Sequence, residues 1–345
     1  MNDQGQLIDF GDDAPIVATV TRVAIRDLAV GNVESVFRIE GVDQRDTKAG
    51  KPYLRLNFAD SSGTLAALMW DGVAEVIDIC KTGAVVAVTG KFEINERYGP
   101  QLTVRTLRTA AADEFDPADL EDVPLFSFDA LQSGFAELVA SIKNPHLSTL
   151  LARLIGPDTE TGRAFMNMPA AKKNHQAYQH GLLEHTLTVA QAVSAAAEIF
   201  PGLDRDLAVT GALIHDIGKL DAYEQNEGGI DLTDEGKLQA EIPLGYYRIK
   251  RTIEDIEGFP PTLAQAILHI QLSHHGRLEH GSPVTPATRE AVLVSMMDNL
   301  GGTLGTYDRL EKTLAGDADW SQFDRAVGES GGSAYFGHSQ GLRGA

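Results

Sequence analysis

Cysteine, long apolar runs and an excess of positive charge are scarce or missing in this sequence. Among the 345 residues there is one cysteine, Cys80, so no intramolecular disulfide can form, and we expect its side chain to be small, apolar and buried. No uninterrupted apolar run approaches the roughly twenty residues that cross a bilayer. The N-terminus also lacks the basic region and apolar stretch of a secretion signal. These absences predict a cytoplasmic protein with no membrane partner.

Basic residues are outnumbered, with 29 Lys and Arg against 49 Asp and Glu and a net charge of -20. Proteins that hold duplex nucleic acid over a broad surface neutralise many phosphates, so this class is disfavoured, whereas a local groove for a single strand is not. The acidity is uneven. Residues 15–112 carry 12 Lys and Arg against 11 Asp and Glu, and residues 113–122 carry six acids and no base. The N-terminal part is therefore close to neutral.

The rest of the composition is that of an ordinary folded protein, with 43% hydrophobic and 23% charged residues. A chain of 345 residues exceeds the usual size of one domain, which predicts two. From Ile16 to about Ala110, short segments alternate apolar and polar residues, as half-buried strands do. The expected strands cover residues 16–25, 53–58, 64–70, 84–94 and 101–107. Five strands in about a hundred residues predict a small closed β-barrel.

Beyond an acidic stretch that contains two prolines, the apolar residues recur with the period of helices. The expected helices include residues 185–200, 207–217, 263–273 and 288–300. The fold class is therefore multidomain α+β, an N-terminal β-barrel followed by an all-α domain. The predicted divisions are an N-terminal extension at 1–14, the barrel at 15–112, an acidic linker at 113–130, the helical domain at 131–320 and a flexible tail at 321–345, rich in Gly and Ser and expected to fray.

Most of the ten histidines lie between His175 and His280, and one of them forms a His-Asp pair at the end of an apolar helix. In that pair, His215 and Asp216, an unpaired buried carboxylate would be costly, and a divalent metal removes the cost by taking both side chains as ligands. An isolated His-Asp pair is more often a packed histidine followed by a capping aspartate. His185 and Asp298, in two other predicted helices, favour the metal site, because ligands from several helices can converge on one ion.

The order H…HD…D, here His185, His215-Asp216 and Asp298, resembles the HD superfamily of metal-dependent phosphohydrolases. More narrowly, the segments HQAYQHGLLEHTLTVA, ALIHDIGKLDAY, LSHHGRLEHGSPVTP and EAVLVSMMDNL resemble the HD domain of the YhaM family of 3'-5' exoribonucleases. The segment KAGKPYLRLNFADSSGTLAALMWDG is similar to the OB-fold nucleic-acid-binding domain that precedes the HD domain in that family. The resemblance covers about residues 15 to 310.

The resemblance implies a divalent-metal cofactor, one or two ions, with Mn²⁺ expected first and Mg²⁺ or another transition metal as alternatives. It also implies catalytic roles for Asp216, which would bridge two ions, and for Lys219, which would steady phosphate charge. Where the family has Gly-His-Ile, this sequence reads Ala240-Glu241-Ile242, and Glu241 can offer oxygen to a hard ion. The implied metal ligands are His185, His215, Asp216, Glu241, His274, His275 and Asp298.

OB-folds bind single strands by stacking bases on exposed aromatic rings and by placing basic side chains along the backbone. Phe58, Phe92 and Trp70 are interpreted as core residues, whereas for the two tyrosines among the candidates core packing and nucleic-acid contact stay open. His175 and His180 are candidates for facing the substrate, and His269 is interpreted as a packed or surface residue. The candidate nucleic-acid contacts are Tyr53, Arg55, Lys91, Tyr98 and Arg105.

These features predict a metal-dependent 3'-5' exoribonuclease that hydrolyses the phosphodiester bonds of single-stranded RNA, with single-stranded DNA as a further substrate to test. The polarity of degradation rests on the family resemblance alone. A homo-oligomer is expected. Two alternatives stay open: an HD hydrolase of small nucleotides or cyclic dinucleotides, and a nucleic-acid-binding protein whose HD site is degenerate, as Glu241 suggests.

Overall fold

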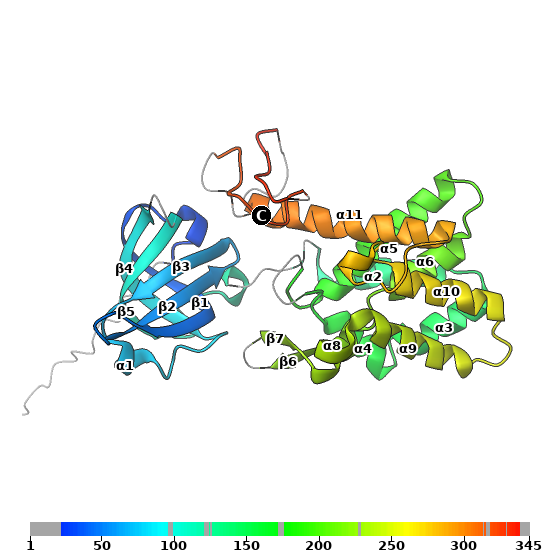
Figure 1. Cartoon of the computed structure of the whole chain (residues 1–345), viewed down its shortest axis with the longest axis horizontal. Helices are drawn as coiled ribbons and strands as arrows, with labels where there is room; N and C mark the ends of the chain where they lie inside the picture. The colour runs from blue at the N-terminus through cyan, green and yellow to red at the C-terminus, as the bar shows by residue number, and fades with distance from the viewer. Residues whose placement is uncertain are drawn as a thin grey trace, which may run out of the picture.

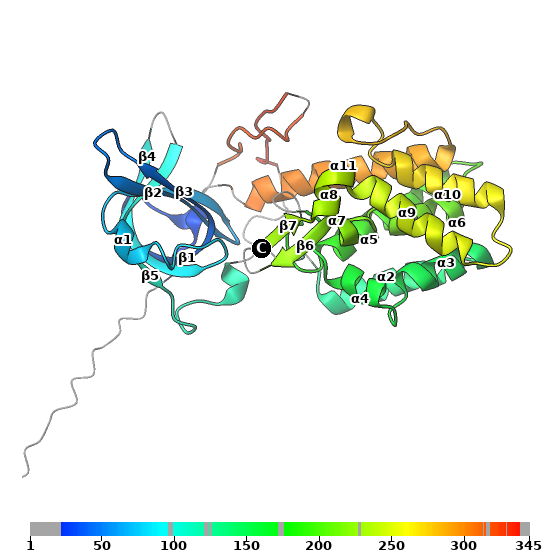
Figure 2. The same ribbon diagram turned by 60° about the horizontal axis from the view of Figure 1, so that its bottom comes forward.

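A β-barrel and a helical domain make up the computed structural model of the chain (Figure 1). The structure describes residues 22–95, 99–120, 124, 126–171, 176–226, 229–312, 314, 318–328 and 330–338. Buried side chains of the barrel and those of the helical domain form separate hydrophobic cores. Figure 2 shows the strands of the barrel apart from the helices from a second direction. Each body is therefore a domain with a core of its own.

The barrel has five strands in the order β1-β2-β3-β5-β4, closed by pairing between β1 and β4. All neighbouring strands are antiparallel except β3 and β5, which are parallel. A closed five-stranded barrel with this strand order is an OB-fold. Its elements are β1 (Gly31–Asp46), β2 (Pro52–Asp60), β3 (Gly63–Met69), the short helix α1 (Val73–Val76), β4 (Val85–Asn95) and β5 (Gly99–Thr109).

The four later strands lie where the alternation predicts them, but the prediction for the first strand was wrong. Of the expected strand at 16–25, only residues 22–25 are described, and they are not a strand but an approach to the 3-10 turn η1 (Ile25–Asp27). The first strand is instead β1, where the period-two pattern fails because Ser35, Val36 and Phe37 are all buried in succession. Burial on both faces of a strand removes the alternation that sequence reasoning uses.

Two chain segments, one against each face of β1, explain this burial. The Ser35 hydroxyl accepts a hydrogen bond from the backbone N–H of Val23 at 2.9 Å and donates one to its carbonyl at 2.7 Å. Leu120 packs against Val36, whose side chain points to the opposite face of the strand. Leu120 belongs to the acidic stretch after β5, of which Glu114 accepts two hydrogen bonds from the Arg108 guanidinium. The described part of this stretch, up to residue 120, therefore packs on the barrel.

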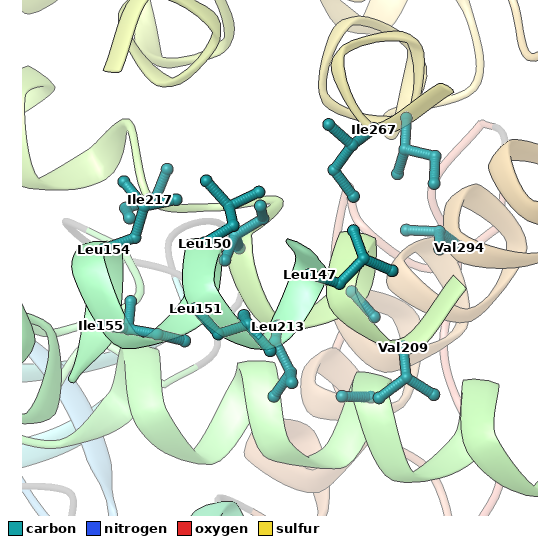
Figure 3. Packing of buried hydrophobic residues seen from close by; sticks show 14 of the residues in the cluster. Leu147, Leu150, Leu151, Leu154, Ile155, Val209, Leu213, Ile217, Ile267 and Val294 are labelled. Carbon is teal, nitrogen blue, oxygen red and sulfur yellow. The ribbon is translucent and has the colours of Figure 1, made fainter. Parts of the chain in front are cut away.

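Among the residues that the structure describes, the helical domain has ten helices, nine of which contribute side chains to one apolar core. Figure 3 shows Leu147 of one helix among Val209, Ile267 and Val294 from three others, and Leu154 of the same helix beside Ile217. The helices are α2 (Phe128–Ala140), α3 (Pro145–Ile155), α4 (Glu160–Asn167), α5 (Gly181–Ile199), α6 (Arg205–Ile214), α7 (Lys219–Ala222), α8 (Asp234–Gln239), α9 (Glu241–Glu254), α10 (Pro261–Ser273) and α11 (Arg289–Lys312).

The domain is not all α, because a two-stranded antiparallel sheet, β6 (Tyr223–Asn226) and β7 (Gly229–Leu232), lies between α7 and α8. Strands of four residues are too short to leave a clear period in the sequence. The four predicted helices correspond to α5, α6, α10 and α11. Within the described ranges, no helix has the length and apolar character needed to span a membrane.

The C-terminal segment, expected from its Gly and Ser content to fray, has a small core of its own. Val327, Ala334 and Phe336 pack against Leu310 and Leu314 at the end of α11. Isolated β-bridges join residues 320 and 335 and residues 324 and 332. Figures 1 and 2 both show this red segment beside the C-terminal end of α11. The described part of the segment thus covers the last turns of that helix.

Candidate metal centre

Imidazoles and carboxylates from five helices or helix ends meet inside the helical domain. One lies near the start of α5, two directly follow α6, one begins α9, two directly follow α10 and one lies halfway along α11. Most of these positions lie at or near the end of a helix. Packing of the helices therefore brings their polar side chains together in the interior of the domain. The seven residues are His185, His215, Asp216, Glu241, His274, His275 and Asp298.

The first group consists of His185, His215, Asp216 and Asp298. The Nε2 atoms of the two histidines are 3.3 Å apart. Asp298 Oδ1 lies 3.1 Å from His185 Nε2 and 3.5 Å from His215 Nε2, and Asp216 Oδ2 lies 3.5 and 3.3 Å from the same two atoms. All four residues are buried or nearly so. Two nitrogens and two oxygens therefore share one small space.

The second group consists of Glu241, His274 and His275, whose ligand atoms lie within 4.8 Å of one another. Glu241 Oε1 is 3.2 Å from His275 Nε2. The second oxygen of Asp216, Oδ1, lies 3.9 Å from His274 Nε2. One oxygen of Asp216 thus faces the first group and the other faces the second. The carboxylate of Asp216 stands between two sets of ligand atoms.

Hydrogen bonds on the far side of three histidines fix which nitrogen faces the centre. The Nδ1 atoms of His215, His274 and His275 lie 2.7, 2.8 and 2.9 Å from the backbone oxygens of Ala212, Gln271 and His280. A carbonyl oxygen can only accept, so each Nδ1 carries a proton and each Nε2 faces the carboxylates, where it would offer a lone pair to a cation that takes the place of a second proton. This is the tautomer in which proteins present histidine to a metal.

A divalent cation fits this set of donor atoms. Lone pairs at Nε2 of His185 and His215 would face each other at 3.3 Å beside two carboxylates, an arrangement that a cation satisfies. The buried Nε2 atom of His274 has no hydrogen-bond partner among the described residues. A buried nitrogen without a partner is costly, and metal coordination removes the cost.

The charges of the centre keep the carboxylates ionised although they are buried. Burial raises the pKa of Asp216, but Lys219 and His215 outweigh it and hold this pKa well below the usual range. Burial likewise raises the pKa of Asp298, and the hydrogen bonds from His185 and His215 bring it well below its usual value. For His274, burial and the neighbouring imidazoles lower the pKa to about 4. Deprotonated acids and a neutral imidazole are the forms that bind metal.

Lys219 lies at the edge of the first group, where its Nζ donates to Asp216 Oδ2 at 2.8 Å. Burial lowers its pKa, yet the negative charges of Asp216 and Glu241 outweigh this and raise the pKa above its usual value. Lys219 is therefore a permanent positive charge beside the shared carboxylate.

Gly218, between the His-Asp pair and Lys219, lets α9 approach the centre. A Cβ atom at Gly218 would lie 2.0 Å from the backbone oxygen of Glu241 and 2.6 Å from the nitrogen of Gly245. Ala240, just before Glu241, has φ 62° and ψ 167°, a conformation that in proteins is almost restricted to glycine. The start of α9 is thus held tightly against the centre, with strain at Ala240.

Other predicted polar residues take different places. His180 lies outside both ligand groups: its Nδ1 is 2.7 Å from the oxygen of Met166, and its ring packs on Phe128. His269 accepts a hydrogen bond from the N–H of Ala287 at 2.8 Å, as a packed histidine does. His175 lies outside the described residues. Sequence reasoning overlooked Glu184, a buried acid that accepts a hydrogen bond from Tyr178 beside His185, although an acid within an apolar helix was a signal.

The barrel residues predicted to contact nucleic acid lie on its outer face. Arg55, Lys91 and Arg105 are exposed, and Tyr53 is half-buried. Tyr98 lies outside the described residues. Phe58 and Phe92 are buried as predicted.

The interpretation of Trp70 as core was wrong, because its side chain is 39% exposed and stacks on Tyr53 with ring centroids 4.6 Å apart. The alternation of inward and outward side chains along β3 could have revealed that Trp70 is exposed. Leu65 and Met69 point inward, so Trp70, which follows Met69, falls on the outer side. Pairing of β1 with β2 also places Arg45, which sequence reasoning overlooked, opposite Tyr53.

Comparison with known proteins agrees with this geometry. The family described as HD domain matches residues 182–302, a span that holds all seven candidate ligands, Glu241 included. The helical domain is accordingly an HD domain, and the chain as a whole is an OB-fold barrel followed by an HD domain.

Similar proteins span both domains. The chain is 31% identical over 292 residues to a 3'-5' exoribonuclease YhaM of Halalkalibacterium halodurans, covering 83% of this chain and 88% of that protein. It is 30% identical over 288 residues to a 3'-5' exoribonuclease YhaM of Geobacillus, covering 83% and 87%. The chain belongs to the YhaM family of 3'-5' exoribonucleases.

Among solved structures, a mitochondrial single-stranded DNA binding protein of S. cerevisiae, Rim1, is 12% identical, with a TM-score of 0.22, and covers 24% of this chain and 95% of that chain. The barrel is an OB-fold by its strand order and closure, and the likeness to this structure is not needed for that assignment.

Proposed function

We propose that this protein is a metal-dependent 3'-5' exoribonuclease that hydrolyses phosphodiester bonds of single-stranded RNA with two Mn²⁺ ions. The observation that carries the proposal is the position of Asp216, whose two oxygens face two separate sets of ligand atoms. The relatives named as 3'-5' exoribonucleases match the chain over both domains, which supports the reaction and its polarity.

Two ions would be held by the two groups, with Asp216 shared. Four imidazoles and three carboxylates form a mixed nitrogen and oxygen set, which suits Mn²⁺ better than Mg²⁺, because Mg²⁺ prefers oxygen ligands throughout. When bound, the ions lower the pKa of a coordinated water and stabilise negative charge on the phosphoryl oxygens.

The residues of the chain itself supply the alignment and the remaining charge. Backbone carbonyls hold the rings of His215, His274 and His275 in one tautomer, so the ligand set is organised before substrate arrives. Lys219 holds Asp216 in place and adds a positive charge beside the position where charge builds up on the phosphoryl group.

The outer face of the barrel is the proposed RNA contact. The stacked pair Tyr53 and Trp70 offers aromatic surface to an unpaired base, and Arg55 and Arg105 are exposed on the same face for the backbone phosphates. OB-folds use the face of their second and third strands for this purpose. Because the barrel sequence is nearly neutral, we expect modest affinity for the strand.

The proposal is tested by digesting single-stranded RNA that carries a label at its 5' end, with Mn²⁺ or with a chelator. Exonuclease action from the 3' end gives a ladder of shortening labelled products, whereas the same RNA labelled at its 3' end loses the label at once. Asp216→Asn should reduce the rate by roughly a thousandfold or more, because the shared carboxylate is lost. Asp234→Asn, at an exposed position on α8, is the matched control.

Three results would overturn the assignment. Release of the label beginning at the 5' end or a single internal cut would contradict the polarity. Equal rates for Asp216→Asn and the wild type would contradict the role of the metal centre. Turnover of cyclic dinucleotides without action on RNA would favour the small-nucleotide hydrolase instead.

A further inference from the structure

The longest helix, α11, carries an exposed apolar stripe on the side away from the metal centre. Val292, Met296, Leu300 and Leu304 recur at intervals of four residues and are 43%, 61%, 46% and 53% exposed. Residues four apart on a helix lie on neighbouring turns, so the four form one continuous ridge about 18 Å long. Four large apolar side chains in a row on the surface are typical of an interface and not of scattered exposure.

The end of α5 carries two further exposed apolar side chains near the start of α11. Ile199 and Phe200 are 73% and 60% exposed and lead into the turn before α6. That turn is fixed to the first turn of α11, because the Glu290 carboxylate accepts a hydrogen bond from the backbone N–H of Asp204 at 2.9 Å. Exposed apolar side chains therefore also lie beside the turn that is joined to the first turn of α11.

The sequence of α11 makes the stripe suited to its own copy. From Ala291 to Tyr307 the only charged residue is Asp298, which points the opposite way, toward His185 in the metal centre. Burying the stripe against an identical surface would therefore bury no charge. The segment 318–338 covers the last turns of α11, so the open part of the helix ends near Leu304.

The charges at the ends of the open part select the orientation. Arg289 precedes the stripe and is exposed, and Asp308 follows it and is half-buried, while the neighbouring Glu290 and Arg309 form contacts within the chain. Two copies of α11 in antiparallel arrangement bring Arg289 of each copy toward Asp308 of the other, whereas a parallel arrangement brings like charges together. Val292 and Leu304 are equally far from residue 298, so an antiparallel pair has its twofold axis there.

We propose that two copies of this chain form a twofold-symmetric dimer through the apolar stripe of α11. The partner is a second copy, because the surface is uncharged, symmetric about residue 298 and complementary in charge to itself when reversed. This interface is independent of the proposed reaction. Since Asp298 lies on the same helix, the dimer would also brace the helix that carries one metal ligand.

The oligomeric state of the full chain tests the proposal by light scattering after size-exclusion chromatography. The wild type should have the mass of a dimer or of an assembly of dimers. The double variant Met296→Glu and Leu300→Glu should associate at least about 100-fold more weakly, because it places charges in the interface. Leu238→Glu, on α8, where the side chain is 84% exposed, should leave the mass of the assembly unchanged.

A cysteine cross-link tests the register and does not depend on the charged variants folding. With the axis at residue 298, two Asn299→Cys residues lie about 3 Å apart along the helix, whereas two Thr303→Cys residues lie about 15 Å apart. Because packed helix axes also lie about 8–10 Å apart and residue 299 flanks the stripe, the suitable probe is a thiol-reactive cross-linker that reaches about 10 Å, which should link the first variant and not the second. The natural Cys80 is buried and does not compete. A monomeric wild type, an assembly unchanged by the glutamates, or equal linking of both cysteine variants would overturn the proposal.

Discussion

At the scale of single residues, the metal centre depends on atoms that no helix pattern describes. The sequence places His215 at the end of an apolar helix, but only the contact of its Nδ1 with Ala212 turns Nε2 inward. The same holds for His274, whose Nε2 is buried and unpartnered among the described residues. Residue type determines which side chains can coordinate a metal, and hydrogen bonds determine whether their ligand atoms point toward it.

Mn²⁺ should stabilise the folded protein, because a ligand that binds only the folded state raises its free energy of unfolding. At a hundredfold excess over the dissociation constant the gain is roughly 3 kcal/mol. His215→Ala should lose most of this gain, and a chelator should abolish it in the wild type. Thermal unfolding followed by circular dichroism measures the effect, with His269→Ala, outside both ligand groups, as the control. A gain that survives in the His215→Ala protein would contradict this ligand assignment.

Ala240→Gly should raise the free energy of unfolding by about 1 kcal/mol, because glycine adopts the observed φ of 62° without strain. Urea denaturation measures the change. Ala264→Gly, within α10, should instead lower the free energy of unfolding by about 1 kcal/mol, since glycine weakens a helix interior. If both substitutions destabilise equally, Ala240 is not strained.

At the scale of elements, contacts between segments decide which strand residues are exposed. The outer face of the barrel and the segment after β5 are two examples. The parity of β3 places Trp70 outward, and β2 brings Tyr53 beside it. The segment after β5 packs on β1 and hides residues that a free strand would expose. The exposed face of a strand therefore cannot be predicted from the sequence of that strand alone, because neighbouring segments decide which face contacts solvent.

Trp70→Ala should raise the KM for long single-stranded RNA by roughly tenfold, because one base loses its stacking surface. The kcat should change little, since the metal centre lies in the other domain. Steady-state digestion of RNA of increasing length separates the two constants. Phe323→Ala, an exposed aromatic outside the barrel, serves as the control. An unchanged KM would show that this face does not hold the strand.

Glu114→Gln should remove a pH dependence of stability. The hydrogen bonds from the Arg108 guanidinium, followed by that from the Ala111 backbone, lower the pKa of Glu114 to about 2, below the 4.5 of an ordinary carboxyl. The stabilisation from this acid is therefore complete above pH 4.5 and is lost as the pH falls toward 2. Urea denaturation across this range should show a shallower loss for the variant than for the wild type. Glu75→Gln, on α1, should follow the wild type.

At the scale of the whole molecule, the two domains have separate cores, which predicts that they fold separately. A chain that begins at residue 126 should keep the circular dichroism of a helical protein and hydrolyse short dinucleotides with Mn²⁺. It should lose most activity on long RNA, because the strand-binding face is removed. Rates on dinucleotides and on a long RNA, compared with the full chain, test this. Equal activity of both chains on long RNA would assign the barrel another role.

The sequence by itself determined the order of the barrel and the helical domain and the places of four helices, and it singled out the candidate metal ligands by residue type. It could do so because hydrophobic period and residue chemistry are local properties of the chain. Only the tertiary structure decided where the first strand lies, that Trp70 is exposed and that Asp216 stands between two ligand groups. It alone showed the open stripe on α11. Each of these depends on which segments, distant in sequence, come to cover or to face one another, and packing in three dimensions decides that.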